Sequence, residues 1–491
     1  MARNIDVSDF VSSIGEWRSR SGPAYRKLAD AIREAVSSAR FPIGAAIPPE
    51  RPLAQALGVS RTTVVGAYER LRVDGWVESV RGSGTRVSRS APPAPDPPGD
   101  AARRRNAAFR GLIDSSGSVV SFLGLHLPAI TPDFEEALSA TVRDAKSLLR
   151  GHGYTGLGLP VLRGAIAAHL TENGLRTRPN EILVTHGGQQ AIGLSAALLL
   201  RPGDTVLLED PTYLGAIDLF EAVGARIVPV PVGSEGLRLD RLAAALQREH
   251  PRAIYLMPTF QNPIGAVLSS DRRREIAALA EKHDAVIIED GTLEDLDLGQ
   301  RPPPPLGAFA KDGRVITVGS LSKLIWGGLR VGWLRASEAL LDPAASLKVM
   351  SDLGNSPLSQ AVALRLLRRL PDVRTRRGKQ VLERFDTLAV ELTDRLPDWK
   401  WERPRGGLSL WVRLPRGSAE EFAPIALRHG VAILPGPVFS PSNGCAEYLR
   451  LPFCLEPDAI RDGVRRLARA WGAYPPAERR DRSPRPLHVV V

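Results

Sequence analysis

Cysteine is scarce in this sequence, and long apolar runs are absent. Only Cys445 and Cys454 occur among 491 residues, which excludes a disulfide framework and a four-thiolate zinc site. The longest uncharged apolar run, Ala191 to Leu200, is about half as long as a membrane-spanning helix needs. The N-terminus carries Asp6 and Asp9 and lacks the apolar stretch of a signal peptide. We therefore exclude membrane and secreted proteins, and we expect a cytoplasmic protein without a metal site.

Lysine is rare as well, and the positive charge is unevenly spread. The chain has 65 basic residues, of which only 8 are lysines, and a formal net charge of +11. Residues 1–90 carry a net charge of +5, whereas residues 91–110 and 475–491 carry +2 each. The long remainder therefore has a net charge of only +2. A basic N-terminal part points to a polyanion such as nucleic acid, although basic surfaces also serve solubility alone.

Proline-rich stretches divide the chain. The segment APPAPDPPGD at 91–100 has five prolines and is followed by three arginines, a composition typical of a semi-rigid linker. The tail from Pro475 has a similar composition, and we predict that it is disordered. At roughly 100 to 200 residues per domain, the length fits two or three domains. The predicted division is an N-terminal extension (1–21), an N-terminal module (22–90), a Pro/Arg-rich linker (91–111), a large domain (112–474) and a basic tail (475–491).

The N-terminal module has the pattern of a helix-turn-helix followed by a hairpin. Apolar residues recur at helical spacing from Tyr25. A second helix is predicted from Arg51 to Leu57, ending at Gly58, and Ser60 is the predicted N-cap of a third helix that runs to about Asp74. The first turn of this third helix, Arg61-Thr62-Thr63, is the part of a recognition helix that reaches base edges. Two apolar segments around the basic tip RGSG then predict a wing.

Residues 22–88, with PPERPLAQALGVSRTTVVGAYERL and RGSGTRV, resemble the winged helix-turn-helix domain of the GntR regulators. The resemblance implies that double-stranded DNA is a partner. A module that docks another protein is the alternative, because three-helix modules with exposed arginines also bind proteins. The DNA contacts that the resemblance implies come from Arg51, Ser60, Arg61, Thr62 and Thr63, and from Arg81 and Gly82 at the wing tip.

Beyond residue 111, apolar runs of five to seven residues alternate with helical segments. This alternation predicts an α/β domain with a mostly parallel sheet and helices on both faces. Ligands of such sheets lie beyond the carboxyl ends of the strands, so the turns after five of these runs should line one site. The five turns are HGGQQ, DPTY, PTFQNP, DGT and SLSK.

Three of these turns carry candidate chemistry. Lys323 stands out in a chain that otherwise uses arginine, and a buried amine with a lowered pKa can form a Schiff base. A surface lysine at a strand end is the alternative. Asp290 ends an apolar strand and could pair with a pyridinium nitrogen. A phosphate could bind at the start of the helix after Gly187, with Gly188, Gln189, Ser320, Ser322 and Arg330 as its partners.

Residues 112–474 resemble the fold-type I aminotransferases that use pyridoxal 5′-phosphate (PLP), and SLSKLIWGGLRVGW is the most specific piece. The resemblance implies PLP as cofactor and a homodimer with shared sites. By resemblance, Lys323 forms the Schiff base and Asp290 holds the pyridine nitrogen. The other implied contacts are Asn262 with the ring hydroxyl, Tyr213 stacked on the ring, Arg450 with a substrate carboxylate, and Tyr154 with the phosphate of the other subunit.

One position departs from the aminotransferase pattern. Many relatives have Asp-x-Tyr, with the tyrosine hydroxyl near the cofactor, where this chain has Asp290-Gly291-Thr292. We expect this loss to change the electronics of the cofactor without preventing its binding. Efficient transamination is therefore less expected than cofactor binding.

The order of a GntR-like module, a proline-rich linker and an aminotransferase-like domain resembles the MocR regulators, of which the GabR-type and PdxR-type proteins are branches. The resemblance implies a transcriptional regulator in which the cofactor, with or without an amino compound, acts as effector. A working aminotransferase with an accessory DNA-binding module is the alternative, because fold analogy alone does not settle function. A DNA-bridging dimer with an inactive cofactor site is disfavoured by the presence of Lys323, Asp290, Asn262 and Arg450.

Overall fold

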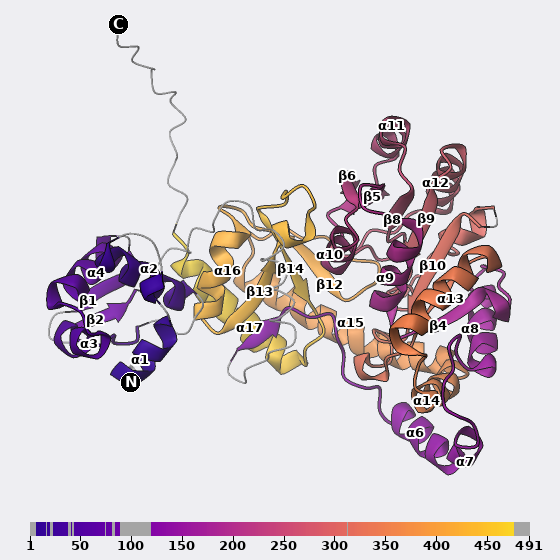
Figure 1. The fold of residues 1–491 in the computed structure, drawn as a ribbon, viewed down its shortest axis with the longest axis horizontal. Coiled ribbons are helices and arrows are strands. Elements are labelled where there is room, and N and C mark those ends of the chain that lie inside the picture. Colours follow the sequence, from indigo (N-terminus) through magenta and orange to yellow (C-terminus); the bar gives the residue numbers. More distant parts are fainter. Residues whose placement is uncertain are drawn as a thin grey trace, which may run out of the picture.

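The computed structural model describes residues 6–15, 17–19, 23–37, 41, 44–73, 75–80, 84–88, 119–311 and 313–475 (Figure 1). Arg81 and Gly82, the predicted linker and nearly all of the predicted tail lie outside the described residues. The described part contains an N-terminal head and a larger body, and the buried side chains of the head form a cluster of their own.

The head is a small helical domain with a two-stranded hairpin. In chain order, its elements are α1 (Val7–Ile14), the short 3-10 helix η1 (Trp17–Ser19), α2 (Ala24–Ser37), α3 (Glu50–Leu57), α4 (Arg61–Val73), β1 (Val77–Val80) and β2 (Gly84–Val87). The strands β1 and β2 pair antiparallel. The predicted helix-turn-helix and hairpin are therefore confirmed.

Local sequence signals fix the turn between α3 and α4. Gly58 ends α3 in the left-handed conformation, at φ 61°, where a side chain would be strained. Ser60 then caps α4, because its hydroxyl accepts a hydrogen bond from the backbone N–H of Thr63 at 3.1 Å. The predicted N-terminal extension also contributes to the head, since Phe10 of α1 stacks on Phe41 with ring centroids 4.6 Å apart.

The body is built on an eight-stranded sheet with the order β4-β11-β10-β9-β8-β5-β6-β7. The strands β6, β5, β8, β9 and β10 form a continuous parallel array, and β11 runs antiparallel between β10 and β4. The predicted mostly parallel sheet is thus confirmed. The strands are β4 (Ile182–Thr185), β5 (Thr205–Asp210), β6 (Arg226–Gly233), β7 (Gly236–Leu237), β8 (Ala253–Leu256), β9 (Val286–Asp290), β10 (Val315–Ser320) and β11 (Gly332–Arg335).

Helices cover both faces of this sheet because alternate side chains of each strand point to opposite faces. Val206 and Leu208 of β5 join the core cluster that contains residues of α8, α9, α10 and α13, whereas Leu207 joins the cluster with α11 and α12. The helices are α6 (Asp133–Arg143), α7 (Ala145–Leu148), α8 (Pro160–Glu172), α9 (Gly188–Leu199), α10 (Leu214–Ala222), α11 (Leu239–Glu249), α12 (Ser270–Lys282), α13 (Glu338–Asp352) and α14 (Pro357–Leu367), with the 3-10 helices η2 (Pro179–Glu181), η3 (Leu306–Phe309) and η4 (Gly327–Leu329).

A second, four-stranded sheet has the order β12-β14-β13-β3. The long helix α15 leads from the large sheet to this part and packs against α17. The elements of this part of the body are β3 (Val120–Phe122), α15 (Leu370–Arg395), β12 (Ser409–Arg413), α16 (Ala419–Arg428), β13 (Val431–Pro435), η5 (Gly436–Phe439), β14 (Tyr448–Pro452) and α17 (Pro457–Ala473). Among the described helices of both domains, none has the length and apolar character that a membrane crossing requires.

Candidate functional site

The carboxyl ends of β5, β8, β9 and β10, together with the turn after β4, surround one cavity of about 190 Å³. Ten residues singled out from the sequence line it, and they come from segments more than 250 residues apart. These ten are Gly188, Gln189, Tyr213, Asn262, Asp290, Ser320, Ser322, Lys323, Arg330 and Arg450.

Lys323 follows β10 and donates a hydrogen bond from Nζ to the backbone carbonyl of Leu125 at 2.7 Å. Burial lowers the pKa of its amine, and the positive charges of Arg450 and Arg330 act in the same direction. A lowered pKa raises the fraction of neutral amine, which is the nucleophilic form. Lys323 lines the cavity. The alternative of a lysine on the outer surface is therefore wrong.

Asp290 ends β9 and is almost fully buried. Its carboxylate accepts hydrogen bonds from the Tyr255 hydroxyl at 2.7 Å and from the backbone N–H of Thr292 at 3.0 Å. Burial raises the pKa of Asp290, while these hydrogen bonds oppose the rise. A buried carboxylate of this kind favours a cationic partner inside the cavity.

The turn after β4 forms a cradle at the start of α9. Gly187 has φ 100°, and a Cβ on Gly188 would lie 2.4 Å from the methyl carbon of Thr292. Side chains at either position would be strained or would clash, so the backbone N–H groups of the first turn stay accessible. Ser322 adds a hydroxyl that has no hydrogen-bond partner among the described residues. The cradle thus fits an anion with several oxygens, such as a phosphate.

Arg450 lies on β14 and is 2% exposed. Its guanidinium donates to Asn262 Oδ1 at 3.1 Å and to the carbonyl of Leu123 at 2.5 Å, while its Nε has no partner among the described residues. Burial lowers the pKa of Arg450 to about 10, so the side chain remains a cation at neutral pH. An unsatisfied, buried guanidinium N–H fits a carboxylate ligand.

A hydrogen bond between Tyr213 and Gln189 joins the turn after β5 to the turn after β4. The Tyr213 hydroxyl donates to Gln189 Oε1 at 2.8 Å, and Gln189 Nε2 donates to the carbonyl of Gly215 at 3.3 Å. A Cβ on Gly215 would lie 2.6 Å from the Tyr213 ring. The close approach of ring and backbone holds the aromatic side chain at the cavity wall.

Tyr154 does not line this cavity. Its side chain is 64% exposed and lies before α8. Tyr154 therefore does not line the cavity of its own chain. Its contact with the phosphate of a second subunit remains a prediction.

Sequence reasoning missed Tyr255, the buried partner of Asp290. The available signal was a tyrosine inside the apolar strand AIYLM, because a buried hydroxyl needs a hydrogen-bond partner. It also missed the carbonyls of Leu123 and Leu125, which bind Arg450 and Lys323. Backbone acceptors have no residue type, so no motif could have indicated them.

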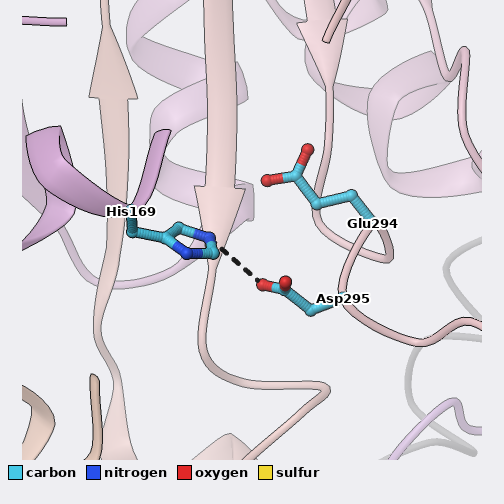
Figure 2. Close-up of side chains that lie close together, drawn as sticks. All are labelled: His169, Glu294 and Asp295. Carbon is cyan, nitrogen blue, oxygen red and sulfur yellow. Dashed lines mark ion pairs between the residues drawn. The ribbon is translucent and has the colours of Figure 1, made fainter. Parts of the chain in front are cut away.

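A second polar cluster consists of Glu294 and Asp295, shortly after Asp290 in the chain, and His169 of α8 (Figure 2). His169 of α8 points toward Asp295, with Nε2 and Oδ2 3.4 Å apart, and the Glu294 carboxylate lies close to both. Burial and the negative charges of Asp295 and Glu289 hold the pKa of Glu294 well above its ordinary value. Arg374 supplies a countercharge to Asp295 at 3.2 Å. The cluster ties the loop that follows Asp290 to α8 and α15.

The head presents the predicted DNA-contacting side chains on its surface. Arg51, Ser60, Arg61 and Thr62 are exposed, whereas Thr63 is half-buried and its hydroxyl lies 2.9 Å from that of Ser60. Thr63 thus takes part in the cap of α4, and Arg61 and Thr62 remain accessible on its first turn. Arg81 and Gly82 lie outside the described residues.

Comparisons with known proteins match two families to different parts of the chain. Residues 128–467 match the family "Aminotransferase class I and II", and residues 24–87 match "Bacterial regulatory proteins, gntR family". The chain is 30% identical to the HTH-type transcriptional regulator YdfD of Bacillus subtilis over 89% of this chain and 94% of YdfD. It is 29% identical to the probable rhizopine catabolism regulatory protein MocR of Rhizobium meliloti, over 81% and 83% of the two chains.

A solved structure is similar to the body of the chain. The α-aminoadipate aminotransferase LysN of Thermus thermophilus, complexed with N-(5′-phosphopyridoxyl)-L-leucine, is 33% identical, with a TM-score of 0.69. The match covers 76% of this chain and 97% of LysN. Fold and site define a class of protein in which a GntR-type DNA-binding head is joined to a PLP-dependent transferase body. The chain belongs to the MocR-type transcriptional regulators, and its cofactor is PLP.

Proposed function

We propose that the protein is a homodimeric regulator whose affinity for DNA depends on an amino compound bound at the PLP site. The observation that carries this proposal is the convergence of ten predicted residues on one cavity, in a chain whose head has an exposed recognition turn. A ligand can change DNA binding only by as much as it favours one arrangement of the protein over another. The ligand must therefore meet residues of the body that differ between those arrangements.

When bound, PLP supplies an aldehyde for amines and a ring that withdraws electrons. Lys323 would attach the cofactor through its amine, and the Asp290 carboxylate would hold the proton of the pyridine nitrogen. Asn262 would donate to the ring hydroxyl, and Tyr213 would lie against the ring. The phosphate would bind Gly188, Gln189, Ser320, Ser322 and Arg330. Two features support this placement: the Gly187–Gly188 cradle, and the Ser322 hydroxyl, which lacks a hydrogen-bond partner within the described part of the chain.

We assign the effector to the amino acids or related amino compounds with a carboxylate. The support is Arg450, whose buried guanidinium has one N–H without a partner among the described residues. A carboxylate there would replace the Leu123 carbonyl, which Arg450 contacts at 2.5 Å. Binding of the carboxylate would thus change the contacts of the segment that follows β3.

A homodimer is supported by a group of exposed apolar side chains beside the site. Gly156 approaches Val349 of α13, and the Thr155 hydroxyl donates to the carbonyl of Asn355 at 3.2 Å, so the two segments lie side by side. Monomeric proteins rarely expose large contiguous apolar patches. In a dimer that covers this patch, Tyr154 would reach the partner's phosphate. The exposed side chains of these two segments are Tyr154, Leu157, Val349, Met350 and Leu353.

The direct test measures DNA binding to the promoter region of the protein's own gene, with and without PLP and a panel of amino acids. We expect a ligand-dependent change in affinity that is lost in Lys323→Ala, whereas basal DNA binding by the heads is retained. A cytoplasmic location, where DNA and free amino acids are both accessible, is part of the same proposal. DNA binding that ignores every ligand would contradict the proposal.

Transamination is the second candidate, because Lys323, Asp290, Asn262 and Arg450 are all in place. Thr292 argues against rapid turnover, because it places a methyl group next to Gly188 and supplies no phenol. We expect slow or absent multiple turnover with amino and keto acids. Fast turnover together with ligand-independent DNA binding would favour the enzyme.

A further inference from the structure

An ion pair between a buried lysine and a partly exposed aspartate adjoins the turn that forms the cradle. Lys348 of α13 is fully buried, and its Nζ lies 2.6 Å from Oδ1 of Asp352 at the end of the same helix. The same Oδ1 accepts the backbone N–H of Gly354 at 2.8 Å. One carboxylate oxygen is thus occupied within its own segment, and the other is available to a different element.

The second oxygen of Asp352 binds both flanks of the cradle turn. Gln190 Nε2 donates to Oδ2 at 2.5 Å, and His186 Nδ1 lies 3.0 Å from the same atom. Gln190 Oε1 in turn accepts the backbone N–H of His186 at 2.8 Å, while the carbonyl of His186 accepts a hydrogen bond from Arg330. The residues on either side of Gly187, Gly188 and Gln189 are therefore fixed by one carboxylate.

Asp352 is ionised in this network. Burial alone would raise its pKa, but hydrogen bonds from Lys348, Gln190 and the Gly354 N–H hold it below the ordinary value. An ion pair that is partly or fully buried seldom adds much net stability. We therefore attribute the role of this ion pair to geometry, because each hydrogen bond to a fixed anion defines the direction of the donor.

We infer that Asp352 is a positioning residue for the cofactor phosphate. Acting through Gln190 and His186, it sets the direction of the backbone N–H groups in the cradle without touching the cofactor itself. The inference rests on the proposed placement of the phosphate at Gly188 and Gln189. The inference predicts that loss of Asp352 weakens binding of the phosphate more than binding of the pyridine ring.

The experiment compares PLP with pyridoxal, which lacks the phosphate, in absorbance titrations of protein freed of cofactor with hydroxylamine. For Asp352→Asn we expect the dissociation constant for PLP to rise about tenfold, as for one lost hydrogen bond to a charge. The constant for pyridoxal should not change. Asp342→Asn, on the exposed side of the same helix, is the matched control and should bind both compounds like the wild type.

A second variant guards against a folding defect. Asp352→Asn leaves Lys348 buried without its ion pair, so the double variant Lys348→Met/Asp352→Asn removes both charges. It should fold and show the same loss of preference for PLP over pyridoxal. Equal weakening of both compounds, or no weakening in either variant, would overturn the inference. A wild-type protein that binds pyridoxal as tightly as PLP would instead refute the proposed phosphate placement.

Discussion

Replacement of Tyr255 by phenylalanine tests the site at a residue that no motif indicated. The change removes one hydroxyl, which donates to Asp290 Oδ2 at 2.7 Å, and keeps the ring. The ring is fully buried and meets Phe220 edge to face, with centroids 5.7 Å apart, so the packing of the core should survive. The effect of Tyr255→Phe therefore isolates a single hydrogen bond.

The size of the effect follows from the charge and burial of Asp290. A hydrogen bond to a charged group contributes about 1.5 to 3 kcal/mol, so PLP should bind about 10 to 150 times more weakly in the variant. The hydroxyl also favours the ionised form of Asp290, whose pKa burial already raises. Its loss should raise that pKa further.

The pH dependence has a definite sign. Asp290 must be ionised to pair with a protonated ring nitrogen, so PLP affinity falls as the pH drops through the pKa of Asp290. This fall should occur at a higher pH in Tyr255→Phe than in the wild type.

Absorbance titrations with PLP at several pH values measure both the affinity and the midpoint of this fall. Tyr474→Phe is the matched control, because Tyr474 donates to Glu421 at 2.7 Å and does not line the cavity. If Tyr255→Phe folds and binds PLP with wild-type affinity at every pH, Asp290 does not hold the cofactor in the way we propose.

Three further experiments test Lys323, the recognition helix and Arg450. Borohydride reduction followed by peptide mapping should place a pyridoxyl group on Lys323, and label on another lysine would reject this assignment of the site. Arg61→Ala should weaken specific DNA binding by roughly 1 to 3 kcal/mol and leave cofactor absorbance unchanged; a mutant that retains wild-type affinity in a gel-shift assay would show that α4 does not read the operator. Arg450→Met should abolish the response of DNA binding to amino acids while PLP still binds, because the lost cation is the proposed carboxylate partner, and a preserved response would place the effector elsewhere.

The sequence predicted the head well because its signals are local. The left-handed Gly58 and the Ser60 cap act within a few residues of the turn that they define. Five strand-end turns likewise predicted the cofactor cavity, because the carboxyl ends of parallel strands meet at one edge. The predicted contribution of Tyr154 from a second subunit remains a prediction, since it concerns another copy of the chain.

By itself, the sequence determined which residue types bear the chemistry and in which turns they stand. Only the tertiary structure decided their partners: Tyr255 for Asp290, the Leu125 carbonyl for Lys323, and Asp352 for the flanks of the cradle. These pairs join strands and helices that are distant in the chain, or they involve backbone atoms that every residue has. Short-range patterns do not encode such contacts, because burial and the alignment of neighbouring elements bring the groups together only when the whole domain has folded.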